Sequence, residues 1–280
     1  MIVYLNTEFL QLENAKISPF DRGFLFADGV YESIRTYKDR LFRYQEHLNR
    51  LKRSLNEMRL TYGETDKIEN IIYELIKKNN IEGEALIYLQ ITRGSSFPRI
   101  HIFPEGGINP TIFISATPLS INEQEQREGI IVSLQRDIRW LRCDIKSVSL
   151  LPIVMANQSA IDAGAKEAIL NRNGKITEGS HTNFFAIKDK TVFTAPECHL
   201  ILSGITRKII LELCYQLEIE VKEQFIKADE LKTYNEFFIT STTKEITPVI
   251  QIDNWVVGKG KSGELTIKLQ NAFRDLVNNN

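Results

Sequence analysis

The sequence has few cysteines, and they are poorly placed for pairing. Cys143, Cys198 and Cys214 are odd in number, scattered along the chain and form no CxxC pair. A disulfide framework or a structural zinc site needs paired or clustered ligands, so this pattern disfavours both. We therefore expect no metal site and a reducing, cytoplasmic compartment.

Long apolar runs and a surplus of one charge are also missing. No segment approaches the roughly 20 apolar residues that a membrane-spanning helix needs. The apolar start, residues 1–6, is short, lacks a basic beginning and soon meets Glu8 and Glu13, which predicts a first strand and not a signal peptide. The formal net charge is −1 without a dense Lys/Arg tract. Membranes and nucleic acids are therefore not expected partners.

The apolar pattern predicts two domains. The chain has 280 residues, 42% of them hydrophobic and 25% charged, which is ordinary for a globular protein. We expect an N-terminal α+β domain over residues 1–118, a polar linker at 119–128 and a C-terminal α/β domain over 129–280. Helical spacing is predicted for 44–58, 68–76, 205–217 and 265–276. Strands are predicted for 86–92, 111–117, 130–134, 168–171, 175–177, 183–187, 191–194, 237–240 and 246–252, with Asn173-Gly174 as a hairpin turn.

Several short segments have residues suited to binding anions. Gly204-Ile205-Thr206-Arg207 places a glycine before a helix, whose first N–H groups favour a phosphate. The run Thr240-Ser241-Thr242-Thr243 follows a strand, where hydroxyl-rich turns also occur. In the loop after residue 92, Arg99 could bind a carboxylate with both of its terminal nitrogens, with His101 as a further donor. Taken singly, each of these features is more often a helix start, a turn or a solvated basic loop.

Two further residues suit cofactor chemistry. Lys146 follows Trp140-Leu141-Arg142-Cys143-Asp144-Ile145, and a neutral lysine amine can form a Schiff base. Spacing alone does not select it among the many lysines. Glu178 follows the predicted hairpin and could pair with a protonated ring nitrogen, although a single glutamate is usually a surface carboxylate.

Taken together, the segments resemble one known family. They are Asp21-Arg22-Gly23, Gly29-Val30-Tyr31-Glu32, residues 46–51, 140–147 and 177–180, Gly204-Ile205-Thr206-Arg207 and residues 240–249. In this order they are similar to the fold-type IV pyridoxal-phosphate enzymes, and most to the branch that acts on D-amino acids. The resemblance covers nearly the whole chain. It implies a two-domain α+β and α/β architecture with pyridoxal 5'-phosphate at the interface.

The resemblance also implies roles for matching residues. Lys146 resembles the Schiff-base lysine and the catalytic base, and Glu178 the partner of the pyridine nitrogen. The phosphate is expected at Arg50, the Ile205 and Thr206 backbone, and Thr242; Ser180, Ser241 and Leu202 are expected to line the cofactor. Tyr31, Arg99 and His101 resemble the trap for the substrate carboxylate, with Ser33 on the substrate side. Because that trap is shared between subunits in the family, a homodimer is implied, with amino acids and 2-keto acids as substrates.

The branch is distinguished by Arg99-Ile100-His101. Branched-chain L-amino-acid aminotransferases and aminodeoxychorismate lyases share the cofactor motifs, and both remain alternatives, as does a cofactor-binding protein without catalysis. Three positions depart from the family pattern: the loop 95–98 is one residue longer, His181 stands where a small hydroxyl residue is usual, and Ser33 is smaller and more polar. The expected reaction transfers the amino group of a D-alanine-type donor to 2-oxoglutarate, giving pyruvate and D-glutamate.

Overall fold

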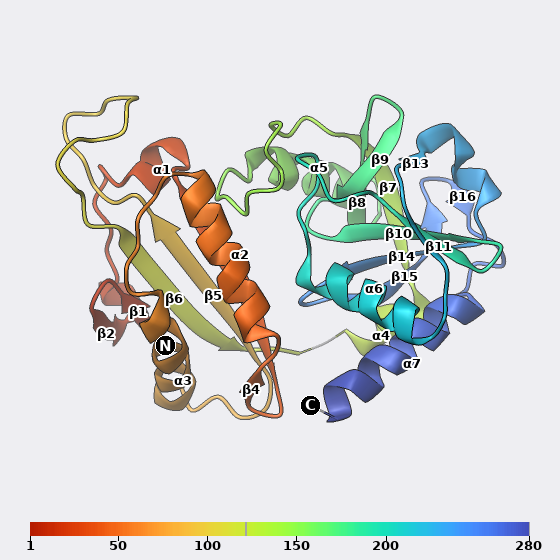
Figure 1. The fold of residues 1–280 in the computed structure, drawn as a ribbon, viewed down its shortest axis with the longest axis horizontal. Helices are drawn as coiled ribbons and strands as arrows, with labels where there is room; N and C mark the ends of the chain where they lie inside the picture. Colours follow the sequence, from red (N-terminus) through yellow and green to blue (C-terminus); the bar gives the residue numbers. More distant parts are fainter. Residues whose placement is uncertain (121, 280) are drawn as a thin grey trace. The chain divides into compact units, whose positions relative to one another are not determined.

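The computed structural model describes residues 1–120 and 122–279, which form two compact units. Unit 1 contains Met1–Ser120 together with Ile145–Ser149, and unit 2 contains Ile121–Asp144 and Leu150–Asn280. The five residues 145–149 thus belong to unit 1, although they interrupt the sequence of unit 2. The stretch 119–128, predicted as a linker, contains helix α4 (Glu123–Glu128), and its residue Ile121 lies outside the described residues. Each unit has its own sheet (Figure 1).

Unit 1 is built on an antiparallel six-stranded sheet with the order β2-β1-β6-β5-β3-β4. Its strands are β1 (Ile2–Leu5), β2 (Glu8–Gln11), β3 (Gly29–Tyr37), β4 (Arg40–Leu41), β5 (Ala85–Thr92) and β6 (Thr111–Pro118), and its helices are α1 (Arg22–Phe26), α2 (Tyr44–Glu57) and α3 (Ile68–Lys78), with short 3-10 turns η1 (Leu12–Asn14) and η2 (Thr65–Lys67). Helix α2 packs on β3, and α3 packs on β1 and β6. The strand and helix predictions for 44–58, 68–76, 86–92 and 111–117 are confirmed.

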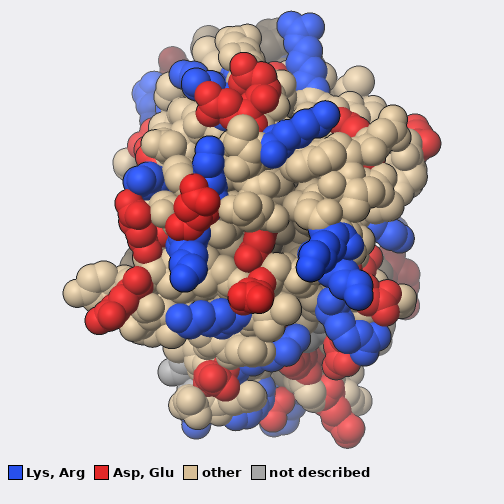
Figure 2. Space-filling view, turned by 90° about the vertical axis from the view of Figure 1, so that its right-hand side faces the viewer, with Lys and Arg blue, Asp and Glu red and all other residues tan. Residues whose placement is uncertain are grey.

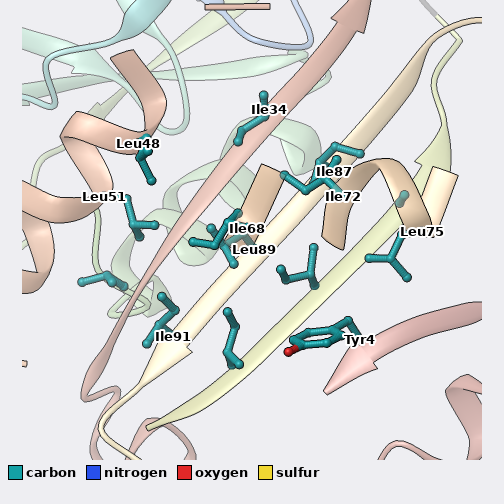
Figure 3. Close-up of a cluster of buried hydrophobic side chains, with 14 of the residues drawn as sticks. Tyr4, Ile34, Leu48, Leu51, Ile68, Ile72, Leu75, Ile87, Leu89 and Ile91 are labelled. Carbon is teal, nitrogen blue, oxygen red and sulfur yellow. The ribbon is translucent and has the colours of Figure 1, made fainter. Parts of the chain in front are cut away.

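The core of unit 1 lies between its sheet and α2 and α3. In β5, alternate residues point inward and are buried, as a half-buried strand requires. They meet the apolar stripe of α2 and that of α3, because residues three and four apart share one helix face (Figure 3). The contributing side chains include Ile34, Ile87, Leu89 and Ile91 from the sheet, Leu48 and Leu51 from α2, and Ile68, Ile72 and Leu75 from α3.

Unit 2 contains a ten-stranded sheet in the order β12-β11-β10-β14-β15-β7-β8-β9-β13, with β16 paired to β15. Its strands are β7 (Ile130–Arg136), β8 (Glu167–Arg172), β9 (Lys175–Gly179), β10 (Asn183–Lys188), β11 (Thr191–Thr194), β12 (Val221–Glu223), β13 (Ile226–Lys227), β14 (Glu236–Ser241), β15 (Glu245–Ile252) and β16 (Trp255–Val256). Besides α4, its helices are α5 (Leu151–Asp162), α6 (Ile205–Gln216) and α7 (Glu264–Asn279), with a 3-10 turn η3 (Ala228–Thr233). Helix α5 packs on β7 and β8, and α6 packs on α7 and β14.

The predicted hairpin between β8 and β9 is confirmed. Asn173 and Gly174 have φ angles of 53° and 80°. A two-residue type I′ turn needs positive φ at both central positions, which asparagine and glycine tolerate. Arg172 pairs with Lys175 across the turn, and Glu178 is the second-last residue of β9.

The surface matches the balanced composition. On the face drawn in Figure 2, lysine and arginine side chains are interspersed with aspartate and glutamate. Within the described residues, no helix is long and apolar enough to cross a membrane. The three cysteines are free thiols.

Candidate active site

Lys146 is held by the backbone of β3. Its carbonyl accepts a hydrogen bond from the Tyr31 amide at 3.0 Å, and the Val148 amide donates to the Gly29 carbonyl at 3.0 Å. The Lys146 amide itself donates to Ser54 Oγ at 3.3 Å. Because the backbone is fixed on both sides, the side chain has a defined origin. Its Nζ lies 4.2 Å from the centre of the Tyr31 ring.

Beside this segment, a buried acid binds two basic side chains of α2. Glu32 accepts hydrogen bonds from Arg50 Nε and Nη2, each at 2.8 Å, and its Oε2 is 2.8 Å from His47 Nδ1. Burial would raise the pKa of the Glu32 carboxyl, but Arg50 and His47 hold that pKa well below its usual range. Burial lowers the pKa of His47, against the opposing effect of Glu32. The guanidinium of Arg50 is thus fixed in direction by a carboxylate, although its side chain is 10% exposed.

One face of the sheet carries two of the predicted substrate residues. Tyr31 and Ser33 point to the same face because they are two apart in β3, and their partners in β5 are Gln90 and Tyr88. The Tyr31 and Tyr88 rings lie 5.9 Å apart, and the Tyr88 hydroxyl donates to Gln90 Oε1 at 2.6 Å. Burial, with Tyr31 beside it, raises the pKa of Tyr88 to about 12. This half-buried polar and aromatic surface can contact a small polar molecule.

Arg99 and His101 lie together on the ring of Phe26. The Arg99 guanidinium is 4.5 Å from the ring centre, and the His101 ring is 5.4 Å away. Both residues are exposed in the loop between β5 and β6. Tyr31 instead packs on Lys146 and Tyr88, so the described residues of one chain do not bring the three predicted trap residues into contact.

In unit 2, Glu178 is buried at the end of β9 and has three donors around it. Arg139 Nη1 donates to Oε1, Asn183 Nδ2 donates to Oε2 at 3.0 Å, and the Leu202 amide lies 3.1 Å from Oε2. Burial raises the pKa of this carboxyl, and the guanidinium of Arg139 counteracts that rise. The Leu202 amide also lies 3.2 Å from Oε1, so the three donors contact both oxygens of this carboxylate. The surface-carboxylate interpretation of Glu178 is excluded by this burial.

Arg139 is itself fixed by Asp137. Its Nε and Nη2 donate to the two oxygens of Asp137 at 3.0 and 2.9 Å, and Arg172 Nη2 adds a further bond at 2.8 Å. Burial would raise the pKa of Asp137, yet these guanidinium bonds lower it to about 2. The sequence pattern did not predict this role of Arg139, since Arg139 and Glu178 are far apart along the chain. The aspartate before Arg139 was the only local signal.

The predicted phosphate segment is a helix start with an open first turn. Gly204 is the N-cap of α6, and no side chain caps that end. Ile205 and Thr206 occupy the first turn, where N–H groups lack intrahelical acceptors. A methyl group at Gly204 would overlap Asn183 Oδ1, so the close approach requires glycine. Asn183 Nδ2 donates to the Leu202 carbonyl at 2.9 Å, which joins this turn to Glu178.

The other predicted cofactor residues of unit 2 contact polar groups of their own unit. The Ser180 hydroxyl donates to the buried Glu167 at 2.5 Å, and His181 Nδ1 lies 3.2 Å from the same carboxylate. Ser241 Oγ accepts from the Lys244 amide at 3.1 Å, and Thr242 is half-buried in the turn between β14 and β15. Arg50 belongs to unit 1, as do Lys146 and the predicted trap residues.

A buried hydroxyl near Glu178 lacks a partner. Thr240 pairs with Asn183 across β14 and β10, so the two side chains share one face of the sheet. Among the described residues, Thr240 Oγ1 is buried without a hydrogen-bond partner. Buried polar groups are normally satisfied, so this hydroxyl indicates a place for a polar ligand. A buried carboxylate at Glu178, an open helix start and an unpaired hydroxyl together fit a phosphorylated nitrogen heterocycle.

Known proteins resemble this chain over nearly its full length. The Amino-transferase class IV family model matches residues 29–252. A curated D-alanine aminotransferase of Staphylococcus haemolyticus is 41% identical over 98% of this chain and 97% of its own.

Solved structures share the fold. The branched-chain amino acid aminotransferase of Escherichia coli has a TM-score of 0.91 with 29% identity, covering 99% of this chain and 94% of that one. Another branched-chain amino acid aminotransferase (from T.th.), solved with pyridoxamine 5'-phosphate, has a TM-score of 0.88 with 25% identity, covering 99% of this chain and 93% of that one. The expected fold-type IV architecture is confirmed. The chain therefore belongs to the class IV aminotransferase family.

Proposed function

We propose that this aminotransferase uses pyridoxal 5'-phosphate to move the amino group of D-alanine-type donors to 2-oxoglutarate or a similar 2-keto acid. The products are pyruvate and D-glutamate. The observation that carries the choice of D-amino acids is the pairing of Arg99 and His101 on Phe26, which presents a guanidinium and an imidazole from one loop. The D-alanine aminotransferase name of the staphylococcal relative supports the same choice.

Lys146 would hold the cofactor covalently, and the Glu178 carboxylate would accept a hydrogen bond from the N–H of its ring. The first turn of α6 at Ile205 and Thr206 would hold the phosphate, together with Arg50 and Thr242, because N–H groups and a guanidinium both favour a dianion. Ser180, Ser241 and Leu202 would line the same site. When bound, the cofactor supplies an electron sink for the electrons of the broken Cα–H bond.

The residues of the chain would then position the substrate and move its proton. Arg99 and His101 would bind the α-carboxylate, with Tyr31 as a further donor and Ser33 beside the substrate side chain. With the carboxylate fixed, only one enantiomer directs its Cα–H toward Lys146 Nζ. Once released from the cofactor, Lys146 would take that proton on Nζ and deliver it again, so one side chain serves as general base and general acid.

A homodimer is part of this proposal. The loop with Arg99 and His101 carries exposed apolar residues, including Phe97 at 77% and Ile102 at 66%, and Phe24 in α1 is 70% exposed. Such a patch favours contact with another protein surface. On this view, the loop serves the site of the second subunit, which fits the separation of Tyr31 from Arg99 within one chain. Sedimentation at micromolar concentration should give twice the mass of 32.2 kDa; a monomer with full activity contradicts the shared site.

The free thiols are consistent with a cytoplasmic location, which is also proposed.

The substrate class is tested by a paired assay. Purified holoenzyme receives D-alanine or L-leucine as donor with 2-oxoglutarate as acceptor, and keto-acid formation is followed. We expect turnover with D-alanine. Turnover with L-leucine alone would assign the chain to the branched-chain enzymes, the second candidate, which the likeness to the Escherichia coli structure favours. Pyruvate release from aminodeoxychorismate without an acceptor would identify a lyase.

A further inference from the structure

The segment before β3 contacts the loop that carries Arg99 and His101. The Arg22 amide donates to the Gly94 carbonyl at 2.9 Å, and the Ser96 amide donates to the Phe20 carbonyl at 3.3 Å. The Phe20 and Phe97 rings meet edge to face at 5.1 Å. These contacts hold the start of the loop, where it leaves β5. They do not involve Arg99 or His101, the two residues proposed to bind the carboxylate.

The side chain of Arg22 reaches the centre of that loop. Its Nη1 donates to the carbonyl of Ile100 at 2.9 Å, and Ile100 stands between Arg99 and His101. Arg22 is only 4% exposed, although the residues it holds are exposed. A charge-assisted bond to this one carbonyl therefore restrains the backbone of both neighbouring residues.

Phe26 adds a second restraint on the same residues. Its ring is 4.7 Å from the Arg22 guanidinium carbon and 4.5 Å from that of Arg99. The His101 ring lies 5.4 Å from it. A guanidinium on an aromatic face keeps its planar orientation, so Phe26 limits the directions in which Arg99 can point.

Asp28 orients Arg22. Its Oδ2 accepts from Arg22 Nε at 2.8 Å and from Arg93 Nε at 2.8 Å. Arg93 in turn donates to the Met58 and Arg59 carbonyls at 2.7 and 2.9 Å, just past α2. The loop is thus connected through buried charged groups to the C-terminal end of α2.

We propose that Arg22, oriented by Asp28 and packed on Phe26, is a positioning residue that sets the placement of Arg99 and His101 for the substrate carboxylate. The inference rests on the proposed function, because it assumes that Arg99 and His101 bind that carboxylate. Amino donor and keto-acid acceptor both present an α-carboxylate. Loss of the restraint should therefore weaken the binding of both and leave the proton-transferring lysine in place.

The test uses the holoenzyme with Arg22→Lys, Arg22→Met and Phe26→Leu. Lysine keeps the charge, but its single ammonium group lacks the planar guanidinium that lets arginine bind Asp28 through Nε and the Ile100 carbonyl through Nη1. For Arg22→Met we expect KM for D-alanine and for 2-oxoglutarate to rise by about 10- to 100-fold while kcat changes by less than about threefold, as for a misplaced binding group. Arg22→Lys and Phe26→Leu should give smaller increases of the same kind. Amide hydrogen exchange of residues 95–103 should become faster in all three.

Two control variants separate the possible outcomes. Arg35→Lys alters another buried arginine, which binds Glu84 and lies 4.1 Å from the Tyr37 ring at the far end of β3. It should leave both KM values and loop exchange unchanged; an equal rise there would overturn the inference by showing a general effect of buried arginines. Arg99→Ala should raise both KM values.

If Arg99→Ala raises both KM values and all Arg22 and Phe26 variants leave them unchanged, the inference is wrong and the proposed function stands. If Arg99→Ala itself has no effect, the proposed carboxylate site fails, and the inference fails with it. Should Arg22→Met not fold, Arg22→Lys and Phe26→Leu decide the question by the same criteria.

Discussion

Replacing Glu32 with glutamine tests whether the buried carboxylate holds Arg50 and His47. The substitution keeps the shape of the side chain but removes its charge. Glutamine has one acceptor oxygen, so it can satisfy at most part of the three contacts at 2.8 Å that Glu32 makes. Its amide group would face the N–H groups of Arg50 or the ring nitrogen of His47. The variant therefore cannot keep the charge-assisted contacts of the carboxylate.

The expected loss of stability follows from burial. Glu32 is 1% exposed, and removing one partner of a buried ion pair costs about 3–5 kcal/mol. The Arg50 side chain, at 10% exposure, can recover some hydration. We therefore expect Glu32→Gln to lower the free energy of unfolding by about 2–4 kcal/mol. The same substitution at Glu46, which forms a partly exposed pair with Arg43 at the start of α2, should cost less than about 1 kcal/mol.

The effect should depend on pH in a defined direction. Because the pKa of Glu32 is lowered in the folded protein, its contribution is fully present above the unfolded pKa of about 4.3 and is lost as pH falls below it. Burial also lowers the pKa of His47, so the unfolded chain takes up a proton below about pH 6.5 that the folded protein resists. Wild-type stability should fall from pH 7 toward pH 4. The deficit of Glu32→Gln should shrink by about 1.4 kcal/mol for each pH unit below 4.3.

Urea unfolding at fixed protein concentration, followed at pH 7.5, 4.5 and 3.5, measures these differences. A Glu32→Gln variant within about 0.5 kcal/mol of wild type at pH 7.5, on the order of an ordinary surface substitution, would refute the reasoning. So would a deficit that grows as the pH falls below 4.3.

Two further substitutions address the proposed cofactor contacts. Lys146→Ala should reduce turnover by more than about 1000-fold, measured by pyruvate formation from D-alanine, while the unfolding midpoint changes little; near-normal activity would sink the assignment. Gly204→Ala should weaken cofactor affinity by about tenfold or more in equilibrium dialysis, because the added methyl would displace Asn183 from Glu178. The matched Gly63→Ala, where nothing lies within 4 Å, should bind normally, and equal affinity for both variants would contradict this interpretation of α6.

Apolar periodicity predicted the elements that bury one continuous apolar face. Helices α2 and α3 have apolar stripes at helical spacing, and β5 alternates regularly, so local pattern and tertiary packing agree. The β8–β9 turn was predictable because Asn173-Gly174 suits positive φ at both positions. In these places, neighbouring residues alone determine the structure.

The pattern failed where polar groups are buried. Strand β3 was not predicted, because Glu32, Arg35 and Thr36 interrupt its apolar residues, yet all three are buried. Their partners come from other elements: α2 for Glu32, and Glu84 for Arg35. Helix α5 was also missed, since its apolar residues include exposed ones such as Leu151 and Val154 and give no clear stripe.

The candidate site was predicted by resemblance more than by residue chemistry. Lys146 and Glu178 have no local pattern that separates them from other lysines and glutamates. Their supporting residues, including Arg139 for Glu178, become visible only when distant segments pack together. The roles assigned to Arg50, Thr242 and the carboxylate trap stay predictions that the experiments above test.

The central claim is that the enzyme acts on D-amino acids. The most direct measurement compares the two enantiomers of one substrate, alanine. Holoenzyme is mixed with D-alanine or L-alanine without acceptor, and the change in cofactor absorbance is followed in a single turnover. We predict a rapid change with D-alanine that depends on its concentration, and a change at least about 100-fold slower with L-alanine, as expected when the carboxylate holds only one enantiomer with its Cα–H toward Lys146. Equal rates, or a faster change with L-alanine, would contradict the account.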